Sequence, residues 1–330
     1  MAKEKKKNKK NKKKLSESNY IYGGGIKAFP HNLSVDIRRN KMIYVLLVLV
    51  LAFFIVFNYA PLFGLLMAFE RFSPVRGVFG SKWVGLENFR KFFGGPYAGR
   101  IIRNTVCIGV LDLLVNFPAP IIFALILNEI HLTPFKKTIQ TISYMPYFIS
   151  AVVACSIVKD FVGGGGAISN LVAPFFKGES VNLLNQKKLF WVIYILQNMW
   201  QGIGYGSIIY LSALSGVDQE LYEAAACDGA GKWKQMIHVT LPGIAPMVLM
   251  MFILRMGSVF SVGADKILLL YGPANYEYSD IINTYIYRMG LMQQDYGTST
   301  AVGLFNSIIG TTMLITSNKI VKKLTGSGMF

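Results

Sequence analysis

Residues 223–229 read Glu-Ala-Ala-Ala-Cys-Asp-Gly, a polar segment between two apolar stretches in the second half of the chain. Asp218 is suited to capping the start of a helix, and Gly229 is suited to ending it in a left-handed turn. A second short helical run is expected over 232–240. Pro242 then falls in the first turn of the next helix, where a proline is tolerated. The pattern predicts two short helices at an angle, held outside a bilayer.

The composition is that of a membrane protein. Charged residues make up 15% of the 330-residue chain and hydrophobic residues 53%, whereas a soluble domain has about a quarter charged residues. The cysteines are three, widely separated and without a CxxC pair, so we expect no metal site and no disulfide framework. No clustered nucleophile, metal ligands or paired carboxylates occur in the apolar stretches, so no catalytic residues are predicted and a membrane enzyme is disfavoured.

Six apolar stretches are long enough to cross a bilayer, which takes roughly 20 residues. We therefore predict an all-α polytopic protein of the cell membrane, with six transmembrane helices, both termini in the cytoplasm and a transmembrane core over 105–320. The predicted spans are 42–69, 105–127, 138–158, 189–211, 241–262 and 301–320.

Positive charge concentrates at the amino terminus. Residues 1–41 hold thirteen Lys and Arg against three acidic residues, which is +10 of the net +17. We expect a disordered cytoplasmic tail near anionic lipid headgroups, followed by a short interfacial helix from Ser34 to Lys41. A nucleic-acid partner is the weaker interpretation of this tail, and none is predicted. Residues 321–330 are predicted to form a cytoplasmic C-terminal tail.

The segments between the predicted spans indicate which side of the membrane each connection lies on. Residues 70–104 are predicted to form an external loop, although their Arg and Lys content runs against the positive-inside tendency. The positive charges of the lysine tail and of the second-half loops outweigh those of residues 70–104, so this segment is still placed outside. Residues 213–240 are placed inside, and 263–300 outside with a short interfacial or re-entrant helix around 281–287.

The segment 223–242 resembles a loop found in a known family. This segment is similar to the cytoplasmic loop of membrane subunits of bacterial ABC importers. The loop pattern is Glu223-Ala224-Ala225, three residues, Gly229, nine residues, an aliphatic residue, one residue and then Leu241-Pro242. The aliphatic residue is Val239 in this chain, where Ile is usual. Other strings resemble the carbohydrate-uptake permeases, most of all the oligosaccharide and polysaccharide branch. These strings are Pro61–Gly64, Trp83–Phe89, Arg103–Thr105, Ala124–Glu129 and Tyr144–Tyr147.

The resemblance implies the type I ABC importer (MetI-like) transmembrane fold. It also implies that the loop docks as a coupling helix into a groove on a separate ATPase subunit. Asp228 lies beside the motif and could instead pair locally with Lys232. The residues assigned to ATPase coupling are Glu223, Ala224, Ala225, Asp228, Gly229, Leu241 and Pro242.

The chain itself is not expected to bind ATP. Residues 229–233 superficially resemble a phosphate-binding loop, but Ala226 and Trp233 occupy positions where that loop needs Gly and Ser or Thr. No cofactor is predicted, and ATP would be bound by the partner. The resemblance implies a second, homologous permease subunit, two ATPase subunits, an external solute-binding protein and a carbohydrate substrate.

Two ionisable residues lie inside predicted spans, Asp112 in the second and Arg255 in the fifth. Counting about 1.5 Å per residue places both roughly 10 Å below the outer surface. Intramembrane charges usually face a partner or a wet cavity. We predict that they pair or line the same aqueous pathway; the alternative is that each snorkels or packs against another subunit.

Sugar sites combine aromatic faces with amide and hydroxyl groups. Five residues of the predicted spans could supply them, although a core or interfacial role is the more common one for each. They are Tyr147, Gln197, Asn198, Trp200 and Asn306.

These features predict a permease subunit of an ATP-driven importer that moves oligosaccharides or polysaccharide fragments by alternating access. An importer permease for a non-sugar solute is the main alternative. An ATP-independent secondary transporter is a further one, and it would not need the Glu-Ala-Ala loop.

Overall fold

The computed structural model describes residues 33, 36, 37, 39–186, 189–326 and 328. The predicted lysine-rich tail therefore lies almost wholly outside the described residues, as does part of the predicted interfacial helix. The chain divides after Gly64 into two compact units, 1–64 and 65–330. Each unit is described by itself.

The first unit holds most of the predicted first span. Helix α3 (Lys41–Phe54) continues as a π-helical turn, η2 (Ile55–Tyr59), and then as a 3₁₀ helix, η3 (Ala60–Phe69), which crosses the division between the units. Pro61 has no N–H to donate and cannot continue a regular α-helical ladder. Apolar side chains of α3 are exposed all along the helix, as a span in lipid requires.

The second unit begins with small elements around a two-stranded antiparallel hairpin, in which Glu70 pairs with Trp83. Long helices follow. In chain order the first half contains β1 (Glu70–Arg71), α4 (Gly77–Gly80), β2 (Lys82–Trp83), α5 (Glu87–Phe93), α6 (Ala98–Asn116), α7 (Pro118–Asn128), α8 (Thr133–Tyr144), η4 (Met145–Phe148), α9 (Ala151–Val162), α10 (Ala167–Val172), η5 (Ala173–Phe176) and η6 (Leu183–Asn185).

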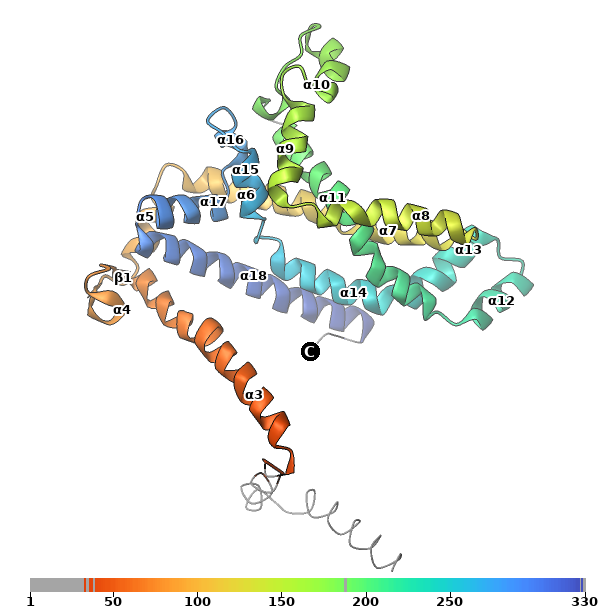
Figure 1. Ribbon diagram of the computed structural model, residues 1–330, viewed down its shortest axis with the longest axis horizontal. Helices are drawn as coiled ribbons and strands as arrows, with labels where there is room; N and C mark the ends of the chain where they lie inside the picture. Colours follow the sequence, from red (N-terminus) through yellow and green to blue (C-terminus); the bar gives the residue numbers. More distant parts are fainter. Residues whose placement is uncertain (1–32, 34–35, 38, 187–188, 327, 329–330) are drawn as a thin grey trace, which may run out of the picture. The chain divides into compact units, whose positions relative to one another are not determined.

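The second half supplies the central helix and both ends of the unit (Figure 1). It contains α11 (Leu189–Ser215), α12 (Gln219–Cys227), α13 (Lys232–Gln235), η7 (Met236–Thr240), α14 (Leu241–Ser258), α15 (Ala264–Leu270), α16 (Tyr276–Ser279), α17 (Ile282–Tyr287), η8 (Arg288–Met292) and α18 (Tyr296–Thr325). Helix α12 lies at one end of the unit and α17 at the other, and these are called the α12 end and the α17 end below.

Several predicted boundaries need correction. Helix α6 begins at Ala98, seven residues before the predicted second span, and α18 runs to Thr325, five residues beyond the predicted sixth. In both cases polar and charged residues extend the helix past its apolar part, which hydropathy alone does not register. The predicted short helix around 281–287 is present as α17.

The predicted third span is two helices rather than one. Pro146 ends the regular ladder in η4, Ile149 is extended, and the Ser150 hydroxyl accepts a hydrogen bond from the Val153 N–H at 3.3 Å to start α9. A proline removes a backbone donor and a serine favours the N-cap, so the break has a local cause.

Helix α11 is the central helix of the unit and contacts α6, α7, α8 and α14. Gly202 and Gly206 lie four residues apart on α11, a spacing that suits close helix contact, but of the two only Gly206 has a neighbour within 4 Å of an added Cβ. A Cβ added at Gly202 would meet nothing within 4 Å, whereas one at Gly204 would lie 2.1 Å from the Ser143 carbonyl oxygen of α8. Gly204, with Gly206 beside Pro120, lets neighbouring backbones approach closely.

Five helical stretches of the described residues are long and apolar enough to cross a membrane. They are Lys41–Phe69, Ala98–Asn128, Ala151–Phe176, Lys232–Ser258 and Tyr296–Lys323. Helix α11 has 27 residues but also carries Gln197, Asn198 and Gln201, which lower its apolarity. It is not among these five stretches, so the predicted count of six spans stays a prediction.

A buried carboxylate fastens the α17 end. Asp280 is 0% exposed and accepts hydrogen bonds from Arg288 at 2.9 and 3.2 Å, from Arg100 at 3.3 Å and from Thr284 at 2.8 Å. Asn104 of α6 donates to the Asp280 carbonyl at 3.0 Å. These contacts join the α16–α17 connection to α6.

Candidate functional site

The predicted coupling segment is a short, well-capped helix. The Asp218 carboxylate accepts from the Glu220 N–H at 3.0 Å at the start of α12. At its end the Gly229 N–H reaches the Ala226 carbonyl at 3.0 Å, and the Ala230 N–H reaches the Ala225 carbonyl at 2.9 Å. Gly229 has φ of 75°, so the helix ends in the left-handed turn that the sequence predicted.

The second predicted helix is not separate. Residues 232–258 form one continuous helical run, in which the π turn η7 joins α13 to α14. Pro242 lies in the first turn of α14, and the wider π turn just before it is a common way to accommodate a ladder defect. The expectation of two separate short helices therefore holds for α12 and is wrong for 232–240, which continues into α14.

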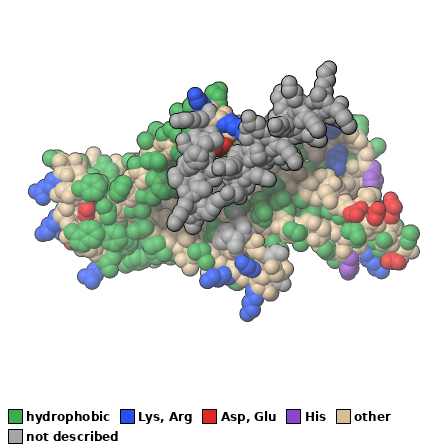
Figure 2. Space-filling model, turned by 90° about the horizontal axis from the view of Figure 1, so that it is seen from below, with side chains coloured by type: hydrophobic (Ala, Val, Ile, Leu, Met, Phe, Trp, Pro, Cys, Tyr) green, Lys and Arg blue, Asp and Glu red, His purple; other side chains and the backbone are tan. Residues whose placement is uncertain are grey.

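The coupling segment is open to solvent. No residue of α12 is buried, and its attachment to the following helix includes one side-chain bond, from the Tyr222 hydroxyl to the Thr240 hydroxyl at 3.0 Å. In the part of the chain that the structure describes, no ion pair joins Asp228 to Lys232, so the local pairing is absent. Figure 2 shows acidic side chains gathered at the α12 end. Glu223, Ala224 and Gly229 are free to meet another surface.

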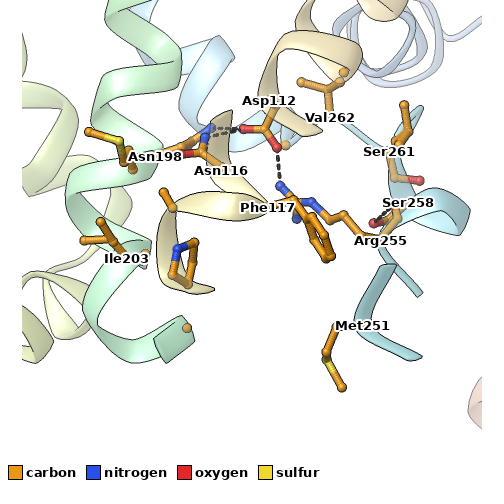
Figure 3. Close-up of a pocket in the computed structure, with 18 of the residues that line it drawn as sticks. Asp112, Asn116, Phe117, Asn198, Ile203, Met251, Arg255, Ser258, Ser261 and Val262 are labelled. Atoms are coloured by element: carbon orange, nitrogen blue, oxygen red, sulfur yellow. Dashed lines mark hydrogen bonds and ion pairs between the residues drawn. The ribbon is translucent and has the colours of Figure 1, made fainter. Parts of the chain in front are cut away.

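A cavity of about 690 Å³ lies among α6, α7, α11, α14 and α15 (Figure 3). Its wall mixes aromatic and aliphatic side chains with charged, amide and hydroxyl groups, as a site for a polar ligand requires. Its polar lining residues include Asp112, Asn116, Tyr194, Asn198, Tyr210, Arg255, Ser258, Ser261, Asp265 and Lys266.

Asp112 is the centre of the polar network in this cavity. Its carboxylate forms an ion pair with Arg255 of α14 and accepts hydrogen bonds from the side-chain amides of Asn116 at 2.7 Å and Asn198 at 3.3 Å. Asn198 in turn accepts from the Lys266 ammonium at 2.8 Å. The network joins α6, α11, α14 and α15. The predicted pairing of Asp112 with Arg255 is therefore present, and both residues line the cavity.

Only three of the seven predicted pathway residues lie in the cavity wall: Asp112, Asn198 and Arg255. Tyr147 instead stacks on Tyr205, with ring centroids 3.9 Å apart. Gln197 is 3% exposed and donates to the Cys155 sulfur at 3.1 Å.

The two remaining residues also lie away from this cavity wall. Trp200 is partly exposed on α11, and Asn306 is buried in α18. A pathway role for the four residues outside the wall stays a prediction.

Lys266 and Asn116 are two of the polar lining residues that the sequence did not predict. Lys266 was placed in an external loop, although the apolar run Ile267–Leu270 after it indicates a short helix packed inside the unit. Asn116 lies four residues after Asp112, the spacing at which helical side chains meet.

Among the described residues no group of three or more His, Cys, Asp or Glu could hold a metal ion. The arrangement suits ligand passage between helices, with an exposed helix at one end through which another protein can act. These features define a polytopic helical membrane protein with a cavity between its helices whose wall mixes apolar and polar groups.

The chain belongs to the family of binding-protein-dependent transport system inner membrane components, whose model matches residues 42–325. It is therefore a permease subunit of a transport system, and the predicted fold class and family resemblance are confirmed.

Curated relatives agree over most of their length. The chain is 40% identical to protein LplB of Bacillus subtilis, over 89% of this chain and 92% of that protein. It is 37% identical to the polygalacturonan/rhamnogalacturonan transport system permease protein YteP of the same organism, over 90% of this chain and 93% of that protein.

A solved structure supports the same fold. A bacterial ABC transporter involved in the import of the acidic polysaccharide alginate matches with a TM-score of 0.81 and 35% identity, covering 89% of this chain and 99% of that one. The match extends to the alginate transporter in complex with an alginate pentasaccharide-bound periplasmic protein, also at a TM-score of 0.81.

Proposed function

We propose that this chain is the membrane-spanning half of an ATP-driven importer of oligosaccharides or polysaccharide fragments. The observation that carries the proposal is the exposed, doubly capped helix α12, which bears the Glu223–Gly229 motif at one end of a unit with a polar cavity. Similarity to permeases named for polygalacturonan and to the alginate transporter supports the carbohydrate class.

In this proposal the chain does not hydrolyse ATP. It moves in response to ATP hydrolysis by a partner subunit. In this proposal α12 docks into a groove on an ATPase subunit, with Glu223, Ala224, Ala225, Asp228 and Gly229 in or beside the contact. Leu241 and Pro242 begin the helix that carries the movement toward the cavity, since 232–258 is one continuous helical run. Residues 229–233 lack the composition of a phosphate loop, so the nucleotide belongs to the partner.

The proposed assembly contains two ATPase subunits, a second homologous permease and an external solute-binding protein. The α12 end faces the cytoplasm together with both chain termini, and the α17 end faces the binding protein. ATP closes the ATPase dimer, α12 moves with it, and the cavity alternates between the two sides. Similarity to the alginate transporter, solved with a pentasaccharide-bound periplasmic protein, supports the binding-protein partner.

The test is ATP hydrolysis by the assembled complex in lipid nanodiscs. Binding protein loaded with each member of an oligosaccharide panel is added to the wild type, Glu223→Ala and Gly229→Pro. One glycan class should stimulate hydrolysis in the wild type and lose its effect in Gly229→Pro. Glu220→Ala, an exposed acidic position on the same helix, is the matched control and should keep the stimulation.

Each alternative has its own outcome. Hydrolysis that no sugar stimulates, but that another solute does, replaces the carbohydrate class with the non-sugar importer. Failure of any ATPase to copurify contradicts the role given to α12. Uptake that collapses with a protonophore while ATP is maintained identifies a secondary transporter.

A further inference from the structure

The Lys266 ammonium lies in the cavity with a neutral partner. Lys266 is half-buried at the start of α15, and its ammonium donates a hydrogen bond to the Asn198 side-chain oxygen at 2.8 Å. An ammonium group has three donors, so this contact leaves donor capacity toward the cavity.

No protein carboxylate neutralises this cation. Within the described ranges, Lys266 forms no ion pair, and Asp112 is committed to Arg255. Asp265 also lines the cavity, but it is solvent-exposed and is not paired with Lys266. Removing a cation from water without a counter-ion is costly. A partly buried, unpaired ammonium in a cavity wall is therefore suited to an incoming anion.

Asn198 holds the ammonium in place. Its amide nitrogen donates to Asp112 at 3.3 Å, which turns its oxygen toward Lys266. Asp112 is itself held by Arg255 and by Asn116 at 2.7 Å (Figure 3). The chain of contacts fixes the position of Lys266 without neutralising it.

The rest of the wall fits a sugar. Ser258 and Ser261 offer hydroxyl groups, and Phe117 and Tyr210 offer ring surfaces. The volume of about 690 Å³ falls within the range of ligand pockets, roughly 300–1,000 Å³. A carboxylate on a sugar ring is the anion that matches both parts of this surface.

We propose that Lys266 binds the carboxylate of a uronic-acid unit, so that the cavity of this chain prefers acidic glycans to neutral ones of the same shape. This inference rests on the proposed function and adds the residue and the charge of the substrate to it. Asn198 is a positioning residue for the ammonium.

The test measures glycan binding to the whole complex without the binding protein, whose own selectivity would mask that of the cavity. Saturation-transfer-difference NMR is suited to weak binding. The ligands are an oligogalacturonide and its methyl ester, which has the same sugar skeleton without the charge. The wild type should bind the acid about ten to a hundred times more tightly, because a hydrogen bond to a charged group is worth about 1.5–3 kcal/mol.

Lys266→Met should reduce this preference to about one by weakening binding of the acid alone, and Lys266→Arg should retain most of it. Lys159→Gln, an exposed lysine of α9 outside the cavity wall, is the matched control and should behave as the wild type. Binding of the methyl ester reports whether the variant complex is folded. A sulfated oligosaccharide of equal length separates carboxylate recognition from general anion binding.

Several results would overturn the inference. If Lys266→Met lost affinity for the acid and for the methyl ester equally, Lys266 would have a structural role. If the preference for the acid were unchanged in Lys266→Met, the selectivity would come from other residues. Equal affinity for the sulfated glycan would remove the carboxylate specificity. If sugars stimulate ATP hydrolysis but the wild type shows no acid preference, only this inference fails. If the wild type neither binds a glycan nor responds to one in the hydrolysis assay, the proposed function fails with it.

Discussion

The two ends of the second unit are held together in opposite ways. At the α17 end, Asp280 is fully buried and is bound by Arg288, Arg100 and Thr284. At the α12 end, no residue of the terminal helix is buried, and the Tyr222–Thr240 bond is its side-chain link to the next helix. Figure 1 shows the long helices running between these ends.

The contrast indicates a division of labour. Removing one partner of a buried ion pair is strongly destabilising, so the α17 end keeps a fixed geometry. Helix α12 is stabilised mainly by its own caps, at Asp218 and Gly229, and can shift as a body at a small cost. In the proposed assembly, the fixed α17 end would suit the docking of the binding protein, and the mobile α12 would suit coupling to the ATPase.

The largest effect on the difference between the two ends is expected from Asp280→Asn, which should loosen the α17 end. The shape of the side chain is kept, but Arg288 and Arg100 lose their counter-ion, and we expect a loss of about 3 kcal/mol in the free energy of unfolding. Thermal unfolding of the purified complex measures it, with Asp160→Asn, an exposed position on α9, as the control. Equal unfolding temperatures for Asp280→Asn and wild type would show that the buried carboxylate does not fasten this end.

A second prediction concerns the cavity between the ends. Replacing Asp112 by Arg, or Arg255 by Asp, places like charges together and should destabilise the complex by about 2 kcal/mol, less than at Asp280 because Arg255 is partly exposed. The double swap should recover about 1 kcal/mol, within the usual coupling of contacting residues. Unfolding of all four complexes gives this coupling. If the double swap were as unstable as the single variants, the interaction between Asp112 and Arg255 would not contribute to stability.

Gly229 tests the mobile end. Gly229→Ala introduces a side chain at φ of 75°, which should cost about 1–2 kcal/mol locally. A Cβ there would meet no other atom within 4 Å, so backbone strain is the only expected cause. The unfolding temperature of the complex should change little, while sugar-stimulated ATP hydrolysis should fall several-fold.

Gly229→Asn is the matched comparison, because Asn tolerates the left-handed conformation better than Ala. It should keep more of the stimulation. Equal loss in both variants would assign the effect to the side chain rather than to the backbone.

Local features of the mobile end could be predicted from sequence. The Asp218 cap and the Gly229 turn involve residues within one helix, and their chemistry is specific to these positions. The pairing of Asp112 with Arg255, 143 residues apart, was also predictable, because counting along two spans gives each charge a depth in the membrane.

Other features depend on tertiary packing. The break at Ile149, the π turn before Pro242 and the position of Lys266 in the cavity are set by how the helices meet. Hydropathy placed Lys266 in a loop because a single lysine beside a short apolar run resembles a loop end. Gln197 looked like a sugar contact because its residue type fits one, but the rotation of α11 buries it against Cys155.

The smallest effect is expected at Asp295, which caps α18 near the α17 end and accepts from the Lys91 ammonium at 2.6 Å. Burial raises the pKa of this carboxyl. The hydrogen bonds from Lys91 and from the Thr298 N–H lower the pKa by more than burial raises it, so the net pKa lies below its usual range. Asp295→Asn keeps a good N-cap and removes only the charge, so the expected loss at pH 7 is below about 1 kcal/mol, since Lys91 is largely exposed.

The pH dependence identifies the source of that loss. Because the pKa of Asp295 is lower in the folded protein, its charge contributes stability above the unfolded pKa of about 3.9, and this contribution is lost as the pH falls toward the folded value. The difference in unfolding temperature between wild type and Asp295→Asn should be constant from pH 7 to pH 5 and narrow below about pH 4. A difference that stays the same at pH 3.5 would mean that the loss in Asp295→Asn does not come from the charge of Asp295. Asp280 would then remain the buried carboxylate that fixes the α17 end.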